Sequence, residues 1–85
     1  MKTRPRDLRI MKTRIRDLRE DADYTQQKVA DYLMCDQSLY SKYEREEREL
    51  PLAYAVKLAD LYGVSLDYLV YRADAKAPYP RRKQP

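Results

Sequence analysis

The chain has 85 residues, of which 44% are hydrophobic and 38% charged, with a net charge of +4 and one glycine. This composition suits one small helical domain, because so little glycine leaves few residues for hairpins or open loops. A lone cysteine excludes an internal disulfide and favours a reducing, cytoplasmic location, and no apolar run reaches the ~20 residues of a membrane span. The lack of histidine and of carboxylates with ligand spacing argues against an enzyme, a cofactor and a metal site.

The positive charge lies at the two ends of the chain. Residues 1–10 carry a net charge of +3 and residues 71–85 a net charge of +4, whereas residues 11–70 carry −3. Three prolines among the last eight residues mark the C-terminal segment as an irregular tail. We therefore expect a domain over residues 11–70, a basic N-terminal extension before it and a basic tail after it.

The first nineteen residues contain a tandem repeat, whose copies differ only where Pro5 corresponds to Ile15. Ile15, Leu18 and Ala22 fall on one helical face, so the second copy predicts the first helix of the domain. No helix breaker follows Pro5 before Ala22, which favours a helix that starts near Pro5 and projects beyond the globule. A basic arm that contacts phosphates and a duplication without a role are the two alternatives.

Two short helices with capping residues are predicted next. Thr25 can cap the first and Asp36 the second, because a side-chain oxygen at this position accepts a backbone N–H of the first turn. Their buried sides are Val29, Ala30 and Leu33 in the first helix, and Tyr40 and Tyr43 in the second. We expect the two tyrosine hydroxyls to reach the surface. The second helix leaves polar side chains outside that are short enough to reach base edges: Gln37, Ser38, Ser41 and Lys42.

A charged connection, EREEREL, leads to the last two predicted helices. Pro51 suits the first turn of the fourth helix, and Gly63 suits the position after its end. The predicted apolar face of this helix consists of Leu52, Ala55, Val56, Ala59 and Tyr62. Ser65 can cap a short fifth helix, whose candidate residues for contact with a second copy are Leu66, Tyr68, Leu69 and Val70. The sequence thus predicts an all-α fold of five helices without strands.

The stretch TQQKVADYLMCDQSLYSKYERE resembles the helix-turn-helix of the phage-repressor and Cro family, widely called XRE. The similarity continues through LPLAYAVKLADLYGVSLDYLV and covers residues 11–70. It implies a five-helix lambda-repressor-like DNA-binding domain, whose helix-turn-helix is formed by the second and third helices.

The resemblance also implies roles for individual residues. The family's DNA-contact positions fall on Gln26, Gln37, Ser38, Ser41, Lys42, Arg45 and Arg48. Gln26 and the two arginines are expected on phosphates, and the other four on base edges. Arg19 and Glu44 match a structural ion pair of many relatives. Met34 replaces a glycine usual in the turn, where a positive φ is expected, and Glu46 also stands where glycine is common.

The function implied is a cytoplasmic regulator of transcription, most simply a repressor that binds an inverted-repeat operator through the helix 37–45 as a homodimer. The alternative is an antitoxin or another protein-interaction module on the same fold, because fold alone does not decide function. A toxin or an antirepressor would then be the protein partner. Neither alternative involves a membrane.

Overall fold

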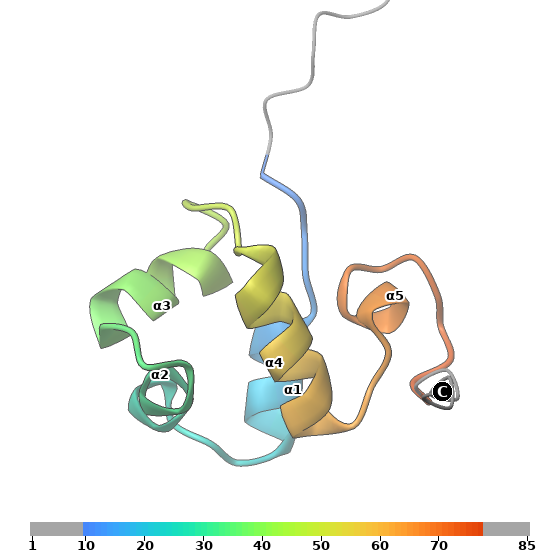
Figure 1. Ribbon diagram of the computed structural model, residues 1–85, viewed down its shortest axis with the longest axis horizontal. Helices are drawn as coiled ribbons and strands as arrows, with labels where there is room; N and C mark the ends of the chain where they lie inside the picture. Colours follow the sequence, from blue (N-terminus) through green and yellow to red (C-terminus); the bar gives the residue numbers. More distant parts are fainter. Residues whose placement is uncertain (1–9, 78–85) are drawn as a thin grey trace, which may run out of the picture.

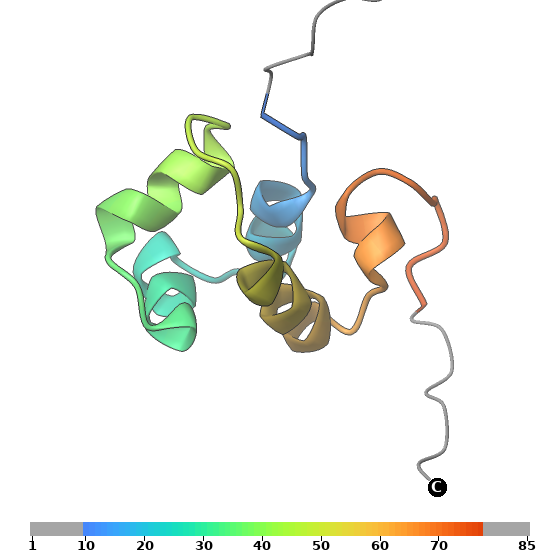
Figure 2. The ribbon, with the colours of Figure 1, turned by 45° about the horizontal axis from the view of Figure 1, so that its top comes forward.

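The computed structural model describes residues 10–77, which are all-helical and contain no strand. The five helices are α1 (Ile15–Asp21), α2 (Gln26–Leu33), α3 (Gln37–Glu44), α4 (Leu52–Tyr62) and α5 (Leu66–Leu69). In Figures 1 and 2, α2 and α3 lie on one side of α1 and α4, and α5 lies on the other. The predicted all-α fold of five helices is therefore confirmed for this part of the chain. None of its helices is both long and apolar enough to cross a membrane.

Every helix contributes side chains to one core. The buried apolar residues are Ile15, Leu18, Val29, Ala30, Leu33, Tyr40, Tyr43, Ala55, Leu58, Ala59, Val64 and Leu69. The predicted buried sides of α2 and α3 are confirmed. The burial of Ile15, which is 1% exposed, also confirms that the second copy of the repeat supplies the first helix.

Two predicted core faces need correction. Ala22 is exposed, because α1 ends before it. On α4 the buried stripe includes Leu58, whereas Leu52 and Val56 are 72% and 41% exposed. Leu52 begins the helix and Val56 lies at the edge of the stripe, so the core cannot reach either side chain fully.

The capping residues predicted at three helix starts are confirmed. Thr25 accepts the backbone N–H of Lys28 (3.0 Å), Asp36 that of Ser38 (3.0 Å), and Ser65 that of Tyr68 (2.9 Å). These bonds satisfy N–H groups that have no partner within the helix. Pro51 differs from the prediction, because it directly precedes α4 instead of occupying its first turn.

All five helices end in the same hydrogen-bonded turn. After α2, for example, the N–H of Met34 donates to the carbonyl of Asp31 (3.0 Å), and that of Cys35 to the carbonyl of Ala30 (2.9 Å). This is the Schellman motif, which requires a left-handed residue. The left-handed residues, with φ between 60° and 67°, are Asp23, Met34, Glu46, Gly63 and Tyr71. The positive φ expected at Met34 is confirmed, and Glu46 has one too.

The first helix begins at Ile15, so the prediction that it runs without a break from near Pro5 is wrong. Residues 10–14 are not helical. The backbone N–H of Arg14 donates to the carbonyl of Leu69 (2.8 Å), in the last turn of α5. Because this tertiary bond fixes the residue before α1, the helix does not extend in the N-terminal direction. Residues 1–9, and the tail from residue 78, lie outside the described residues.

The fifth helix is exposed at its start and buried at its end. Leu69 is fully buried, so the prediction that it contacts a second copy is wrong. The short helix needs this side chain to attach to the core. Leu66 remains 37% exposed.

Candidate nucleic-acid interface

The packing of α3 against α2 leaves the polar side of α3 facing solvent. Ala30 is fully buried and has only a methyl side chain, which lets the two helices approach closely. The connection of three residues then turns the chain, and α3 crosses α2 (Figures 1 and 2). With Tyr40 and Tyr43 in the core, the polar side of α3 faces outward.

Six of the seven predicted DNA-contact residues surround one open hollow of about 350 Å³. They are Gln26, Gln37, Ser38, Ser41, Lys42 and Arg45. We refer to it as the reading hollow, because four of these residues are predicted to contact base edges. Gln37 and Ser38 are exposed, and Ser41 and Lys42 are half-buried. Arg48, the seventh residue, is exposed but does not line this hollow.

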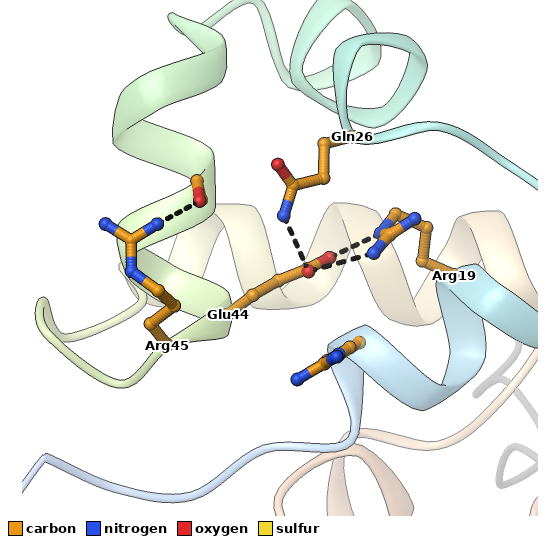
Figure 3. A pocket seen from close by; sticks show the side chains of 6 residues that line it. Arg19, Gln26, Glu44 and Arg45 are labelled. Carbon is orange, nitrogen blue, oxygen red and sulfur yellow. Dashed lines mark hydrogen bonds and ion pairs between the residues drawn. The ribbon is translucent and has the colours of Figure 1, made fainter.

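The two glutamines of this hollow are connected. Gln37 Nε2 donates to Gln26 Oε1 at 3.5 Å, and Gln26 Nε2 donates to Glu44 Oε1 at 3.0 Å. The second bond ends on a side chain that is only 2% exposed. The buried Glu44 therefore orients Gln26, as Figure 3 shows. Gln26 in turn lies against Gln37, the first residue of α3.

The predicted ion pair between Arg19 and Glu44 is confirmed. Arg19 Nε and Nη2 donate to the two carboxylate oxygens at 2.6 and 3.1 Å, and Tyr40 donates its hydroxyl to Oε2 at 2.5 Å. The Tyr40 hydroxyl is thus buried, contrary to the prediction, because the carboxylate accepts it inside the core. Burial raises the pKa of Glu44, but the hydrogen bonds from Arg19, Tyr40 and Gln26 outweigh burial and lower it below its ordinary value.

Arg45 is the cation of the reading hollow with the most hydrogen bonds. Its guanidinium donates to Ser41 Oγ and, at 2.9 and 3.1 Å, to both carboxylate oxygens of Glu47. The hydrogen bonds to Glu47 raise the pKa of Arg45 above its ordinary value. About half of each side chain of the ion pair is exposed, so a phosphate can compete for the guanidinium.

A second hollow of about 230 Å³ adjoins the first, because both are lined by Gln26, Ser41 and Arg45. Its other walls are Arg19, Glu44 and Arg16. Sequence reasoning missed Arg16. The signal was its spacing of three from Arg19, which places both arginines on neighbouring positions of α1.

The chain matches the family model HTH_3, described as helix-turn-helix, over residues 15–69, from the start of α1 to the end of α5. Three regulators of Bacillus subtilis are similar to it. The uncharacterised HTH-type transcriptional regulator YobD is 37% identical over 70 residues, which are 82% of this chain and 62% of YobD. The HTH-type transcriptional regulator ImmR is 39% identical over 57 residues, or 67% of this chain and 45% of ImmR.

The third relative is the SPbeta prophage-derived uncharacterised HTH-type regulator YonR, 37% identical over 57 residues, which are 67% of this chain and 53% of YonR. The chain thus spans less than two thirds of the length of each of these relatives. No solved structure matches it significantly.

Proposed function

The chain belongs to the helix-turn-helix family, and from this membership we propose that it is a sequence-specific DNA-binding regulator of transcription. The observation that carries the proposal is the reading hollow, where six predicted DNA-contact residues meet on the α2–α3 pair. The three relatives, all named as HTH-type transcriptional regulators, support the same function.

In this proposal the N-terminal half of α3 enters the major groove. Gln37 is exposed at its first position, and a glutamine amide can pair with the N6 and N7 atoms of adenine. Ser38 can donate to or accept from a neighbouring base, and Lys42, one turn further on, can donate to guanine. Gln26 sets the approach, because it lies beside Gln37 and is itself bound to Glu44.

Phosphates on both sides of the groove would then contact Gln26, Arg45 and Arg48. Arg45 would exchange Glu47 for a phosphate oxygen. A guanidinium presents its N–H groups as a planar fork that matches phosphate as well as carboxylate. These contacts position the helix without reading sequence.

We further propose that the protein acts as a cytoplasmic repressor and binds an inverted repeat as a homodimer. Two copies with one recognition helix each require half-sites about 34–36 Å apart, one turn of DNA. Exposed apolar side chains near α5, Leu66 (37%) and Tyr71 (49%), are available to such a contact.

The test is selection of bound sites from random double-stranded DNA, followed by Gln37→Ala. We expect this substitution to weaken binding to the selected site by about 1–3 kcal/mol and to relax the base preference at one position of each half-site. Gln27→Ala is the control, because Gln27 is an exposed glutamine of α2 that bonds to Asp31 and lines neither hollow. A folded Gln37→Ala protein with unchanged base preference would contradict the role of α3.

A protein-interaction module, such as an antitoxin, is the second candidate. The observation in its favour is the net charge of −3 over residues 11–70, which favours a protein partner over DNA. The same selection separates the two functions: recovery of no enriched DNA site would support this alternative. A toxin or antirepressor partner belongs to this proposal.

A further inference from the structure

The hollow between α1, α2 and α3 has features of an anion site that the family match does not assign. Its walls contain three guanidinium groups, those of Arg16, Arg19 and Arg45, and one carboxylate, that of Glu44. Glu20 and Glu47 pair with Arg16 and Arg45 from outside the lining, so an anion that replaces these two carboxylates would meet two guanidinium groups. We refer to it as the side hollow, to distinguish it from the reading hollow.

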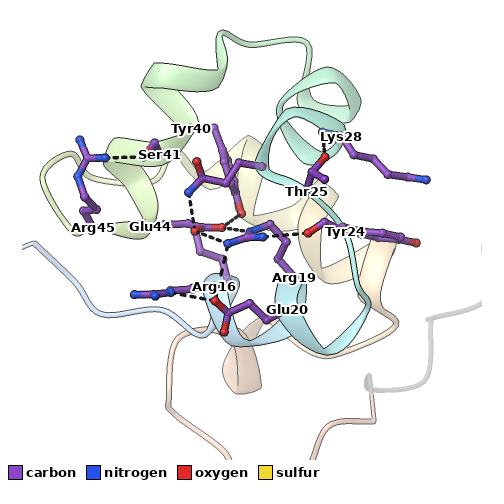
Figure 4. A network of polar contacts seen from close by, with 12 residues as sticks. Arg16, Arg19, Glu20, Tyr24, Thr25, Lys28, Tyr40, Ser41, Glu44 and Arg45 are labelled. Atoms are coloured by element: carbon purple, nitrogen blue, oxygen red, sulfur yellow. Dashed lines mark hydrogen bonds and ion pairs between the residues drawn. The ribbon is translucent and has the colours of Figure 1, made fainter.

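Only two of the three guanidinium groups can bind a new partner. Arg19 already donates to both oxygens of Glu44 and to the carbonyl of Tyr24, and its side chain is 13% exposed. Arg16 and Arg45, in contrast, are 66% and 51% exposed. Figure 4 shows them at the start of α1 and the end of α3, both on the same side of the Glu44 carboxylate.

Both exposed arginines donate hydrogen bonds to exposed carboxylates, which an anion can replace. Arg16 Nε donates to Glu20 at 3.2 Å, and Arg45 donates to Glu47 at 2.9 and 3.1 Å. Glu20 and Glu47 are each 52% exposed. Such exposed pairs stabilise a fold little, so a phosphate can replace either carboxylate at small cost.

We propose that Arg16 and Arg45 hold one phosphodiester of the DNA backbone over the side hollow, with Arg16 as a phosphate contact supplied by α1. The inference rests on the proposed function. Its geometric basis is that the two hollows share the residues Gln26, Ser41 and Arg45. A DNA strand whose bases enter the reading hollow would pass its backbone over these residues and so reach the side hollow. Arg16 then adds a positioning contact from outside the helix-turn-helix.

The decisive experiment measures the affinity for the selected site as a function of salt, in the full chain and in Arg16→Gln. We expect the slope of log affinity against log salt to fall by up to about 0.9 for each half-site, the value of one phosphate contact, because Arg45 remains on the same phosphate. Ethylation of one phosphate per half-site should weaken the full chain more than Arg16→Gln, which keeps only the Arg45 contact to that phosphate. Arg16→Lys, which keeps the charge, should retain most of the slope.

Lys57→Gln is the matched control. It removes the same charge from α4, where Lys57 is exposed and lines neither hollow. Equal slopes for Arg16→Gln and Lys57→Gln, both folded by thermal melting, would overturn the inference while leaving the proposed function intact. Failure of the full chain to select any DNA site would instead overturn the proposed function.

Discussion

At the scale of single residues, Glu44 is a charged side chain that is only 2% exposed. Its carboxylate is almost inaccessible to water but accepts hydrogen bonds from Arg19, Tyr40 and Gln26 (Figure 4). A buried charge with a full set of donors is tolerated, whereas one that loses a partner is costly. The same carboxylate also orients Gln26, so it links stability to the proposed DNA contact.

We predict that Arg19→Met lowers the free energy of unfolding by about 3–5 kcal/mol at pH 7, because it leaves the Glu44 carboxylate buried without its cation. Urea denaturation measures the loss. Arg16→Gln is the control, since it breaks only an exposed ion pair and should cost less than about 1 kcal/mol. Equal losses in the two variants would contradict the buried role of Arg19.

The same pair gives the protein a pH dependence with a defined sign. Because the pKa of Glu44 in the folded state lies below its ordinary 4.5, the ion pair stabilises the fold fully above that value. Its contribution disappears as the pH falls through the lowered pKa. The difference in stability between the parent chain and Arg19→Met should therefore shrink in acid, and a difference independent of pH would contradict this assignment.

At the scale of helices, the repeated feature is the left-handed residue after each C-terminus. Only Gly63 among these five positions has the residue type that adopts this conformation without a penalty. Asp23, Met34, Glu46 and Tyr71 each carry a Cβ there, which costs roughly 1–2 kcal/mol. Short helices need these turns because the Schellman bonds satisfy carbonyls that a helix end leaves without partners.

We predict opposite effects for two substitutions at these positions. Met34→Gly should raise the free energy of unfolding by up to about 1 kcal/mol, because Met34 is 84% exposed and loses little packing. Glycine's greater freedom in the unfolded chain limits the gain. Gly63→Ala should lower it by about 1 kcal/mol, and only through backbone strain, since an added Cβ meets no atom within 4 Å. Thermal melts of both variants test this, and a loss of several kcal/mol for Met34→Gly would contradict it.

At the scale of the whole domain, Arg14 connects the start of α1 to α5 and to the segment that follows α5. The guanidinium donates to the carbonyls of Tyr68 (2.7 Å) and Ala73 (3.3 Å). It also lies 4.0 and 4.1 Å from the ring centres of Tyr68 and Tyr71. A planar cation between two aromatic rings, with two backbone acceptors, closes the domain at the point where the N-terminal segment leaves it.

We predict that Arg14→Lys lowers the free energy of unfolding by about 1–2 kcal/mol, because an ammonium cannot reach both carbonyls and stack on the rings together. Hydrogen exchange should become faster at the amides of residues 69–73, where the structure loosens first. Lys12→Gln is the control, since Lys12 is exposed two residues earlier. Unchanged exchange in Arg14→Lys would show that the contact contributes little.

The sequence alone was sufficient for features that depend on neighbours along the chain. The helix starts at Thr25, Asp36 and Ser65 follow from one side chain and the next turn. The buried faces of α2 and α3 follow from helical spacing. The candidate phosphate contacts Gln26, Arg45 and Arg48 and the Arg19–Glu44 pair, by contrast, were predicted through the resemblance to a known family, whose motif carries their positions.

Tertiary structure decided the features that depend on distant segments. The start of α1 is set by a hydrogen bond from the backbone N–H of Arg14 to the carbonyl of Leu69. No local signal in the repeated sequence shows that this N–H has a partner in another helix. The exposed side of α4 depends on how far the core extends beside it. Arg16 becomes a candidate contact only because α1 packs beside the pair α2–α3, where the ends of three helices enclose a hollow that helical periodicity cannot reveal.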